Sequence, residues 1–177
     1  MKIIVLAFFI AISGLVRAES SEGERAKKSI ELTVSAGVDY RMSPTQFAAY
    51  YFLDKNNLLG LKAGADRNSE ERQTSVAFQY KHFTGNSFYI APEIFYLNTR
   101  EDDTWLLKLF NINVDGYSEY VSMGAGVRIG NQWSWRHFSI GADWIGYGRR
   151  IGVFRRDNDK ASENTWTLLN IYAGLSF

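Results

Sequence analysis

Residues 120–130 read YVSMGAGVRIG, and hydrophobic residues alternate along them with small or charged ones. The alternation divides the stretch into two sets, Val121, Met123, Ala125, Val127 and Ile129 against Ser122, Gly124, Gly126 and Arg128. A period of two residues is typical of a β-strand, because successive side chains point to opposite faces. This stretch therefore predicts a strand with one apolar face and one small or charged face.

The same alternation recurs along the rest of the chain. Eight segments carry it, at residues 30–39, 46–54, 59–64, 74–83, 87–97, 120–130, 137–144 and 165–177. Gly, Asn, Asp and Ser residues separate these segments, as expected of turns between strands. Eight successive strands predict an all-β protein.

Composition limits the class of protein further. The chain has 177 residues, 46% of them hydrophobic, which is enough for one domain with a real core. It has no cysteine, which excludes a disulfide scaffold, a cysteine-based zinc site and a thiol nucleophile. Lys and Arg number 20 against 19 acidic residues, so no basic excess indicates a nucleic-acid partner. We expect no metal and no cofactor.

Residues 1–18 have the pattern of a secretory signal peptide. Lys2 makes a positive start, residues 3–16 are almost entirely apolar, and Ala18 is a small residue before a polar stretch. An apolar run of about 14 residues is short against the ~20 that a membrane-spanning helix needs. We therefore expect cleavage near Ala18 and a polar periplasmic N-terminal segment over residues 19–28.

Alternation alone fits two kinds of barrel. In a soluble barrel the apolar faces form the core, whereas in an outer-membrane barrel they face lipid and the polar faces fill the lumen. The connections favour the second kind, because short turns at one end and long loops at the other are typical of it. Short turns are expected at 54–57, 84–86 and 130–132, and long loops at 65–73, 98–118 and 147–164.

The end of the chain favours the membrane alternative as well. Residues 171–177 read IYAGLSF, in which the apolar Leu175 and the terminal Phe177 alternate with small residues. This stretch resembles the C-terminal insertion signal of outer-membrane β-barrels. Aromatic residues also gather near both ends of the expected strands, as in interfacial girdles.

In size and plan the chain resembles the OmpA transmembrane-domain and OmpX-like barrels. The resemblance implies an eight-stranded antiparallel up-and-down transmembrane β-barrel over residues 29–177, in the outer membrane of a Gram-negative-type cell. Strands of ~10 residues tilted by ~45° are long enough to span the hydrocarbon layer. The partners implied are outer-membrane lipid and lipopolysaccharide, and the barrel-assembly machinery through the C-terminal strand.

The polar faces predict a filled lumen. Eight strands enclose a space that side chains can fill, so a general porin is not expected. Both signs of charge fall on the inward faces, which predicts a network of buried ion pairs and hydrogen bonds. Its expected members are Glu31, Asp39, Lys62, Lys81, Glu93, Arg128 and Asp143. A gated ion path through the same charges is the alternative.

One segment suggests an enzyme as an alternative. His137-Phe138-Ser139 resembles the His-x-Ser motif of outer-membrane lipid A deacylases, in which a histidine base would activate a serine. Ile140 follows where that family has Asn, and His137 lies close to a short turn, far from the outer leaflet. The favoured interpretation of His137 is a polar lumen residue, with no catalytic site.

Two loops are the expected interaction surface, because loops on a rigid scaffold often carry binding function. One has an apolar cluster, Trp105, Leu106, Leu107 and Phe110, which is either a projecting hairpin or a contact site for a partner. The other has Arg149, Arg150, Arg155 and Arg156, which are suited to lipopolysaccharide phosphates or form a solvated loop. The expected function is therefore a structural or loop-mediated role towards lipopolysaccharide, a host surface or an extracellular protein. The alternatives are the lipid A hydrolase and a soluble periplasmic lipocalin-like ligand-binding barrel.

Overall fold

The computed structural model describes residues 21–40, 45–67, 71–102, 117–155 and 164–177. A short helix, α2 (Ser21–Arg25), precedes eight strands. The strands are β1 (Ile30–Tyr40), β2 (Thr45–Phe52), β3 (Asn57–Arg67), β4 (Glu71–Phe83), β5 (Phe88–Asp102), β6 (Tyr117–Ser134), β7 (Phe138–Arg155) and β8 (Asn164–Ser176).

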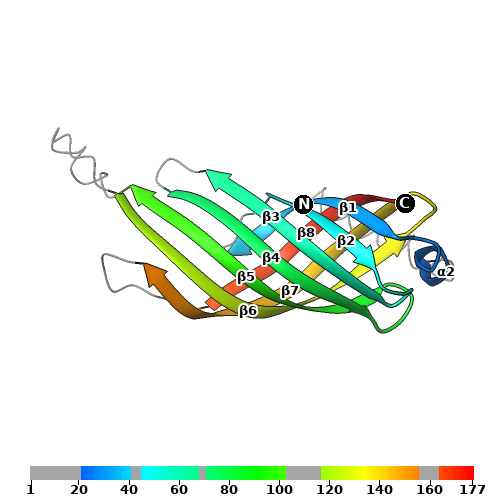
Figure 1. Ribbon diagram of the computed structural model, residues 1–177. Helices are drawn as coiled ribbons and strands as arrows, with labels where there is room; N and C mark the ends of the chain where they lie inside the picture. The colour runs from blue at the N-terminus through cyan, green and yellow to red at the C-terminus, as the bar shows by residue number, and fades with distance from the viewer. Residues whose placement is uncertain (1–20, 41–44, 68–70, 103–116, 156–163) are drawn as a thin grey trace, which may run out of the picture.

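Each strand pairs with the next in antiparallel fashion, and β1 pairs with β8 to close the barrel. The ribbon shows a tilted cylinder with α2 at the end where β3 follows β2 and β5 follows β4 (Figure 1). The predicted eight-stranded antiparallel up-and-down barrel is confirmed. The expected signal peptide at 1–18 lies outside the described residues.

The polarity of the barrel is inverted relative to a water-soluble protein. The outward side chains are mostly large and apolar, for example Leu61, Phe78 and Ile94, each about half exposed or more. The inward side chains are mostly polar or charged, and most of them are buried. The soluble lipocalin-like alternative requires the opposite arrangement, so it is not compatible with this structure.

The strands at the long-loop end reach further than the sequence analysis expected. β5 continues to Asp102 and β7 to Arg155, so residues 98–102 and 147–155 of the expected loops 98–118 and 147–164 belong to strands. Residues 65–67 and 71–73 of the loop expected at 65–73 likewise belong to β3 and β4. The reason is that these strand ends carry polar residues on their outward face, which removes the apolar alternation that marks a strand in sequence.

The prediction of a turn at residues 130–132 was wrong. β6 runs on to Ser134, and the turn is formed by residues 135–137, where Trp135 N donates to Phe138 O. Gly130 and Gln132 are turn-like residue types, but Gly130 lies opposite Tyr89 and Gln132 is buried in the lumen. In the described part of the chain, no helix has both the length and the apolarity to cross a membrane.

Candidate functional site

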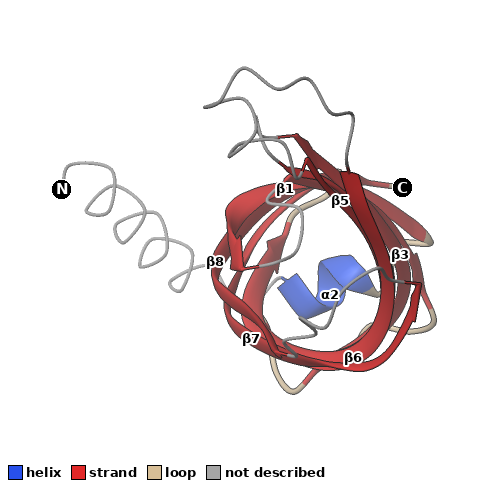
Figure 2. Ribbon diagram, turned by 90° about the vertical axis from the view of Figure 1, so that its left-hand side faces the viewer, coloured by secondary structure: helices blue, strands red, loops and turns tan. Residues whose placement is uncertain are grey.

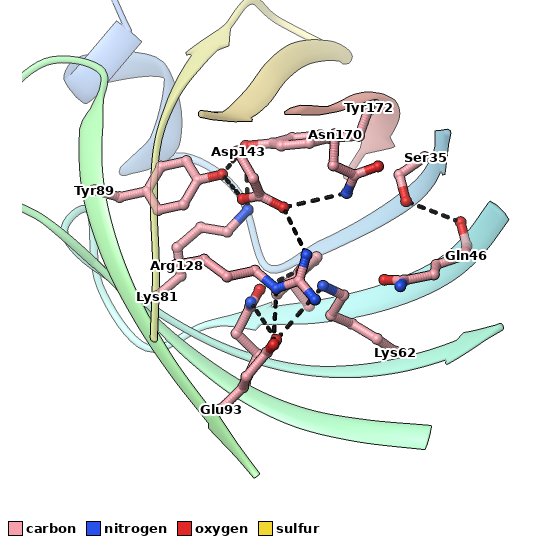
Figure 3. Close-up of polar contacts among 12 residues, drawn as sticks. Ser35, Gln46, Lys62, Lys81, Tyr89, Glu93, Arg128, Asp143, Asn170 and Tyr172 are labelled. Atoms are coloured by element: carbon pink, nitrogen blue, oxygen red, sulfur yellow. Dashed lines mark hydrogen bonds and ion pairs between the residues drawn. The ribbon is translucent and has the colours of Figure 1, made fainter. Parts of the chain in front are cut away.

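Four buried charges form the centre of the lumen (Figure 3). Arg128 Nε donates to Glu93 Oε1 at 2.7 Å, and Arg128 Nη1 lies 3.6 Å from Asp143 Oδ2. Lys62 Nζ is 3.6 Å from Glu93 Oε2. Two cations thus face two carboxylates inside the barrel, so the cluster is neutral as a whole and each charge has an opposite partner, as burial requires.

Neutral side chains complete the bonding of the two carboxylates. Gln79 Nε2 donates to Glu93 Oε2 at 3.0 Å, and Asn170 Nδ2 donates to Asp143 Oδ2 at 3.2 Å. Tyr89 OH donates to the other Asp143 oxygen. Because these donors approach from several strands, the cluster ties together parts of the barrel wall that are not neighbours in the sheet.

Lys81 lies in a cage of three tyrosine rings. Its Nζ is 4.4 Å from the ring centroid of Tyr50, 4.6 Å from that of Tyr89 and 4.5 Å from that of Tyr172. It also donates to Gln132 Oε1 at 3.0 Å and to Tyr172 OH at 3.3 Å. Aromatic faces attract an ammonium group, and the attraction grows when water is excluded. The cage therefore surrounds a buried cation with aromatic rings, in addition to its two hydrogen bonds.

Each tyrosine of the cage lies opposite a glycine on the neighbouring strand. The register pairs are Tyr50 with Gly60, Tyr89 with Gly130 and Tyr172 with Gly141. A Cβ on these glycines would come within 2.2, 2.6 and 2.3 Å, respectively, of the facing tyrosine. The inward glycines at these three positions make room for the aromatic rings that surround Lys81.

A third cluster lies nearer the short turns. Gln132 Nε2 donates to both oxygens of Glu31, at 3.1 and 3.0 Å, and Ser139 Oγ donates to Glu31 Oε1. His137 is exposed in the turn before β7, and its side chain does not share the lumen with Ser139. The expected lumen position of His137 was therefore wrong, because residue 137 precedes the strand. His137 and Ser139 are not arranged as a base and its nucleophile.

The helix α2 lies across the short-turn end of the barrel, where an end-on view shows it inside the ring of strands (Figure 2). Arg25 is fully buried there, and its guanidinium donates to three backbone carbonyls: Lys55 O at 2.8 Å, Asn86 O at 2.5 Å and Gly85 O at 3.1 Å. It also lies 3.9 Å above the ring of Phe83. Burial lowers the pKa of Arg25 to about 10, so it stays charged at neutral pH.

Further contacts attach the same segment to other turns. Ser21 Oγ accepts from Ser134 N at 3.0 Å, and Lys28 Nζ donates to Trp135 O at 2.7 Å. Glu22 pairs with Lys55 at 2.6 Å on the surface. Residues 19–28 were expected to form a polar periplasmic N-terminal segment. From Ser21 onward, this segment lies against the short turns and closes that end of the barrel.

The structure places the remaining predicted residues as follows. The side chain of Asp39 and residues Trp105, Leu106, Leu107, Phe110 and Arg156 lie outside what the structure describes, as does the side chain of Arg155. Arg149 and Arg150 were expected in a loop but belong to β7, where Arg149 faces outward and Arg150 is buried. Leu175 and Phe177 face outward, and Phe177 O accepts from Ser29 N and Ile30 N where β8 meets β1.

Sequence reasoning missed the tyrosine cage and Arg25. The cage had a weak signal, since Tyr50, Tyr89 and Tyr172 fall at inward positions of their strands. Arg25 had none, because a helix of one turn with charged residues has no apolar stripe.

The arrangement fills the bore of the barrel with side chains that bond to one another. The described residues contain no group of three or more His, Cys, Asp or Glu residues that could hold a metal ion. The charges are joined to one another by ion pairs and hydrogen bonds from Lys62 at one side to Glu31 at the other. The ion pairs run from Lys62 through Glu93 and Arg128 to Asp143. Hydrogen bonds continue from Asp143 through Tyr89, Tyr172 and Gln132 to Glu31. Such a network stiffens the barrel from within.

The fold and the lumen together define the class of protein. It is a closed eight-stranded up-and-down barrel with a polar interior. The crystal structure of the N-terminal β-barrel domain of Pseudomonas aeruginosa OprF shares this fold, with a TM-score of 0.51 and 15% identity over 85% of this chain and 98% of that one. Neisserial surface protein A (NspA) shares it with a TM-score of 0.54 and 13% identity over 84% of this chain and 93% of that one. No protein-family model matches the chain. No curated protein matches its sequence.

Proposed function

We propose that this protein is an integral outer-membrane barrel with a side-chain-filled lumen, which acts structurally and through the ends that it presents outside the cell. The observation that carries the proposal is the apolar outer face of a closed barrel. A wall of exposed Leu, Ile, Val and Phe side chains is stable in lipid and prone to aggregate in water.

The height of the apolar face agrees with a bilayer. On β3 and β4 it lies between a polar row at the short-turn end, Asn57 beside His82, and a charged row at the other end, Arg67 beside Arg72. These rows are ten residues apart along β3, which at ~3.3 Å per residue is about 33 Å along the strand. A tilt of about 45° reduces this to about 23 Å, close to the ~25 Å apolar band of outer-membrane barrels.

The lumen supports a role other than general diffusion. Arg128, Glu93, Lys81 and Tyr172 are buried and bonded across the bore, and α2 covers one end of it. A porin needs an open aqueous path, which is found in barrels of many more strands. We infer a structural role without enzymatic activity.

The interaction surface proposed is the long-loop end. Arg149, Arg155 and Arg156 and the apolar loop residues around Trp105 and Phe110 belong to that end in sequence. The partners proposed are lipopolysaccharide, a host surface or an extracellular protein. That one of the proteins sharing the fold is named a surface protein agrees with this proposal.

The test is cell fractionation followed by electrophoresis of unheated and boiled samples. An outer-membrane protein whose band shifts on boiling is the expected result, because a closed barrel resists detergent until it is heated. A soluble periplasmic protein without a shift would refute the proposal. Black-lipid-membrane recordings add the second part: the folded protein should give no porin-sized conductance.

A further inference from the structure

The short-turn end of the barrel contains a site that fits the whole guanidinium group of Arg25. Its three nitrogens reach three different carbonyls: Nε donates to Lys55 O at 2.8 Å, Nη1 to Asn86 O at 2.5 Å and Nη2 to Gly85 O at 3.1 Å. Its Cζ lies 3.9 Å from the centroid of the Phe83 ring. We call the three carbonyls and this ring the carbonyl cradle. The ammonium group of a lysine, which concentrates its charge at one point, does not match such a planar set of acceptors.

The cradle is held by contacts that do not involve α2. Phe83 N donates to Asn56 O at 2.7 Å, which fixes the β2–β3 turn against β4. Thr84 N donates to Phe88 O at 3.0 Å and closes the β4–β5 turn. The Phe83 ring packs edge-to-face against the Tyr89 ring, with 5.5 Å between their centroids. We therefore expect the carbonyls and the ring to keep their places when α2 is not docked.

The segment that fills the cradle is bound by polar contacts. α2 is a single turn, and its buried residues are Ser21 and Arg25. Among the residues that the structure describes, the guanidinium is hydrogen-bonded only to neutral groups, the three carbonyls and Ser21 Oγ. Undocking of α2 thus exposes no large apolar side chain of its own and breaks no hydrogen-bonded ion pair of Arg25. Such a ligand is suited to exchange with another one.

We propose that the carbonyl cradle is a binding site for an arginine side chain of another polypeptide, and that Arg25 occupies it when no such partner is bound. The site rests on the proposed function, since an outer-membrane barrel presents its short turns to the periplasm. The ligand is an arginine-containing segment of a protein that reaches the periplasmic side of the membrane.

The partner and α2 compete for the same acceptors. Residues 26–29 join Arg25 to β1, and a linker as short as this gives a tethered ligand an effective concentration in the ~mM range. Arg25 therefore keeps the cradle occupied until a partner adds contacts of its own. Binding of the partner then releases α2 from the end of the barrel, where it lies inside the ring of strands (Figure 2).

The experiment measures the binding of two peptides to the folded, isotope-labelled protein in detergent micelles. One peptide has the sequence of residues 21–28, SEGERAKK, with both ends blocked, and the other is the same peptide with the substitution R25K. Binding is followed by the NMR shifts of the Gly85 and Asn86 amides, and release of α2 by hydrogen exchange of its own amides. The proteins are the unaltered chain, R25A, which empties the cradle, and the matched control K27A, which removes an exposed cation of the same segment.

We expect R25A to bind the arginine peptide at least about tenfold more tightly than the lysine peptide, because only the guanidinium matches the three carbonyls. The unaltered protein and K27A should bind the arginine peptide at least about tenfold more weakly than R25A, because Arg25 competes from within the chain. At about 10 mM arginine peptide, above the effective concentration of the tether, the α2 amides of the unaltered protein should exchange at least about tenfold faster.

Three results would overturn the site. They are equal binding of the two peptides by R25A, binding of the arginine peptide by the unaltered protein or K27A as tight as by R25A, and α2 exchange that the arginine peptide leaves unchanged. A parent protein without a heat-shifted band would refute the proposed function, whereas a heat-shifted protein whose α2 is not released refutes the site alone. Since release of α2 is measured on the unaltered protein, it decides the matter even where R25A does not fold.

Discussion

Replacing Arg128 by methionine removes the cation that lies between the two buried carboxylates of the lumen. The cluster then keeps Glu93 and Asp143 against Lys62 alone, so it changes from neutral to a net negative charge. Breaking a buried ion pair by removing one partner costs about 3–5 kcal/mol. We expect the lower part of that range, about 3 kcal/mol, because Lys62 still reaches Glu93 at 3.6 Å and neutral donors remain on both carboxylates.

A second substitution tests whether the uncompensated charge is the cause. The double variant R128M/E93Q has one cation and one carboxylate left, so it is neutral again and should recover at least ~1.5 kcal/mol of the loss. The control is R149M, which replaces an exposed arginine on the outer face of β7 and should change the free energy of unfolding by less than about 0.5 kcal/mol.

Unfolding of the protein from lipid vesicles in urea provides the measurement. The folded fraction is read from the unheated gel band, and midpoints are compared at an unchanged slope. An R128M midpoint equal to that of the unaltered protein would refute the reasoning. A double variant no more stable than R128M would refute the role given to charge balance.

Three further predictions concern the end closed by α2 and the tyrosine cage. R25A removes the charged donor to three carbonyls, and each such bond contributes ~1.5 kcal/mol or more. Trypsin should therefore cut the chain between α2 and β1 at least about tenfold faster. An unchanged cleavage rate would contradict the role of Arg25 in holding α2 against the end of the barrel. G141A forces a Cβ against the Tyr172 ring and should destabilise the barrel by about 1–3 kcal/mol, whereas G85A, which meets nothing within 4 Å, should change urea stability little. The bond and charge of Lys55 lower the pKa of Glu22 below its ordinary value of 4.5, so the link between α2 and the β2–β3 turn is fully present above pH 4.5 and is lost as pH falls through the lowered pKa. Hydrogen exchange of the α2 amides, corrected for intrinsic rates, should therefore rise at low pH in the unaltered protein and show no such step in K55M.

The strands could be predicted where an apolar outward face alternates along the sequence with a small or polar inward face. Val121, Met123 and Val127 lie on the outward side and alternate with small or charged inward residues, and the structure has a strand there. The prediction of the strand ends failed where the strands continue beyond the apolar part of the outer face. Arg100 and Arg149 face outward on strands that continue beyond it, and a charged outward residue looks like a loop in sequence.

The alternation of residues along a strand also indicates which side chains face inward, but it does not show which of them contact one another. That Arg128 reaches Glu93 follows from the stagger of strands around a closed barrel, which no local pattern records. The turn at 130–132 was misjudged for a related reason. Gly130 is needed to seat Tyr89 across the sheet, and only the three-dimensional register shows that need.

The contacts of α2 set an order on assembly. Arg25 bonds to carbonyls 30, 60 and 61 residues further along the chain, and Ser21 and Lys28 bond to positions 113 and 107 residues away. None of these partners is in place until the strands that carry them have paired, and contacts between distant parts of a chain form slowly. The segment that precedes the strands therefore cannot dock before the turns that follow β2, β4 and β6 have formed.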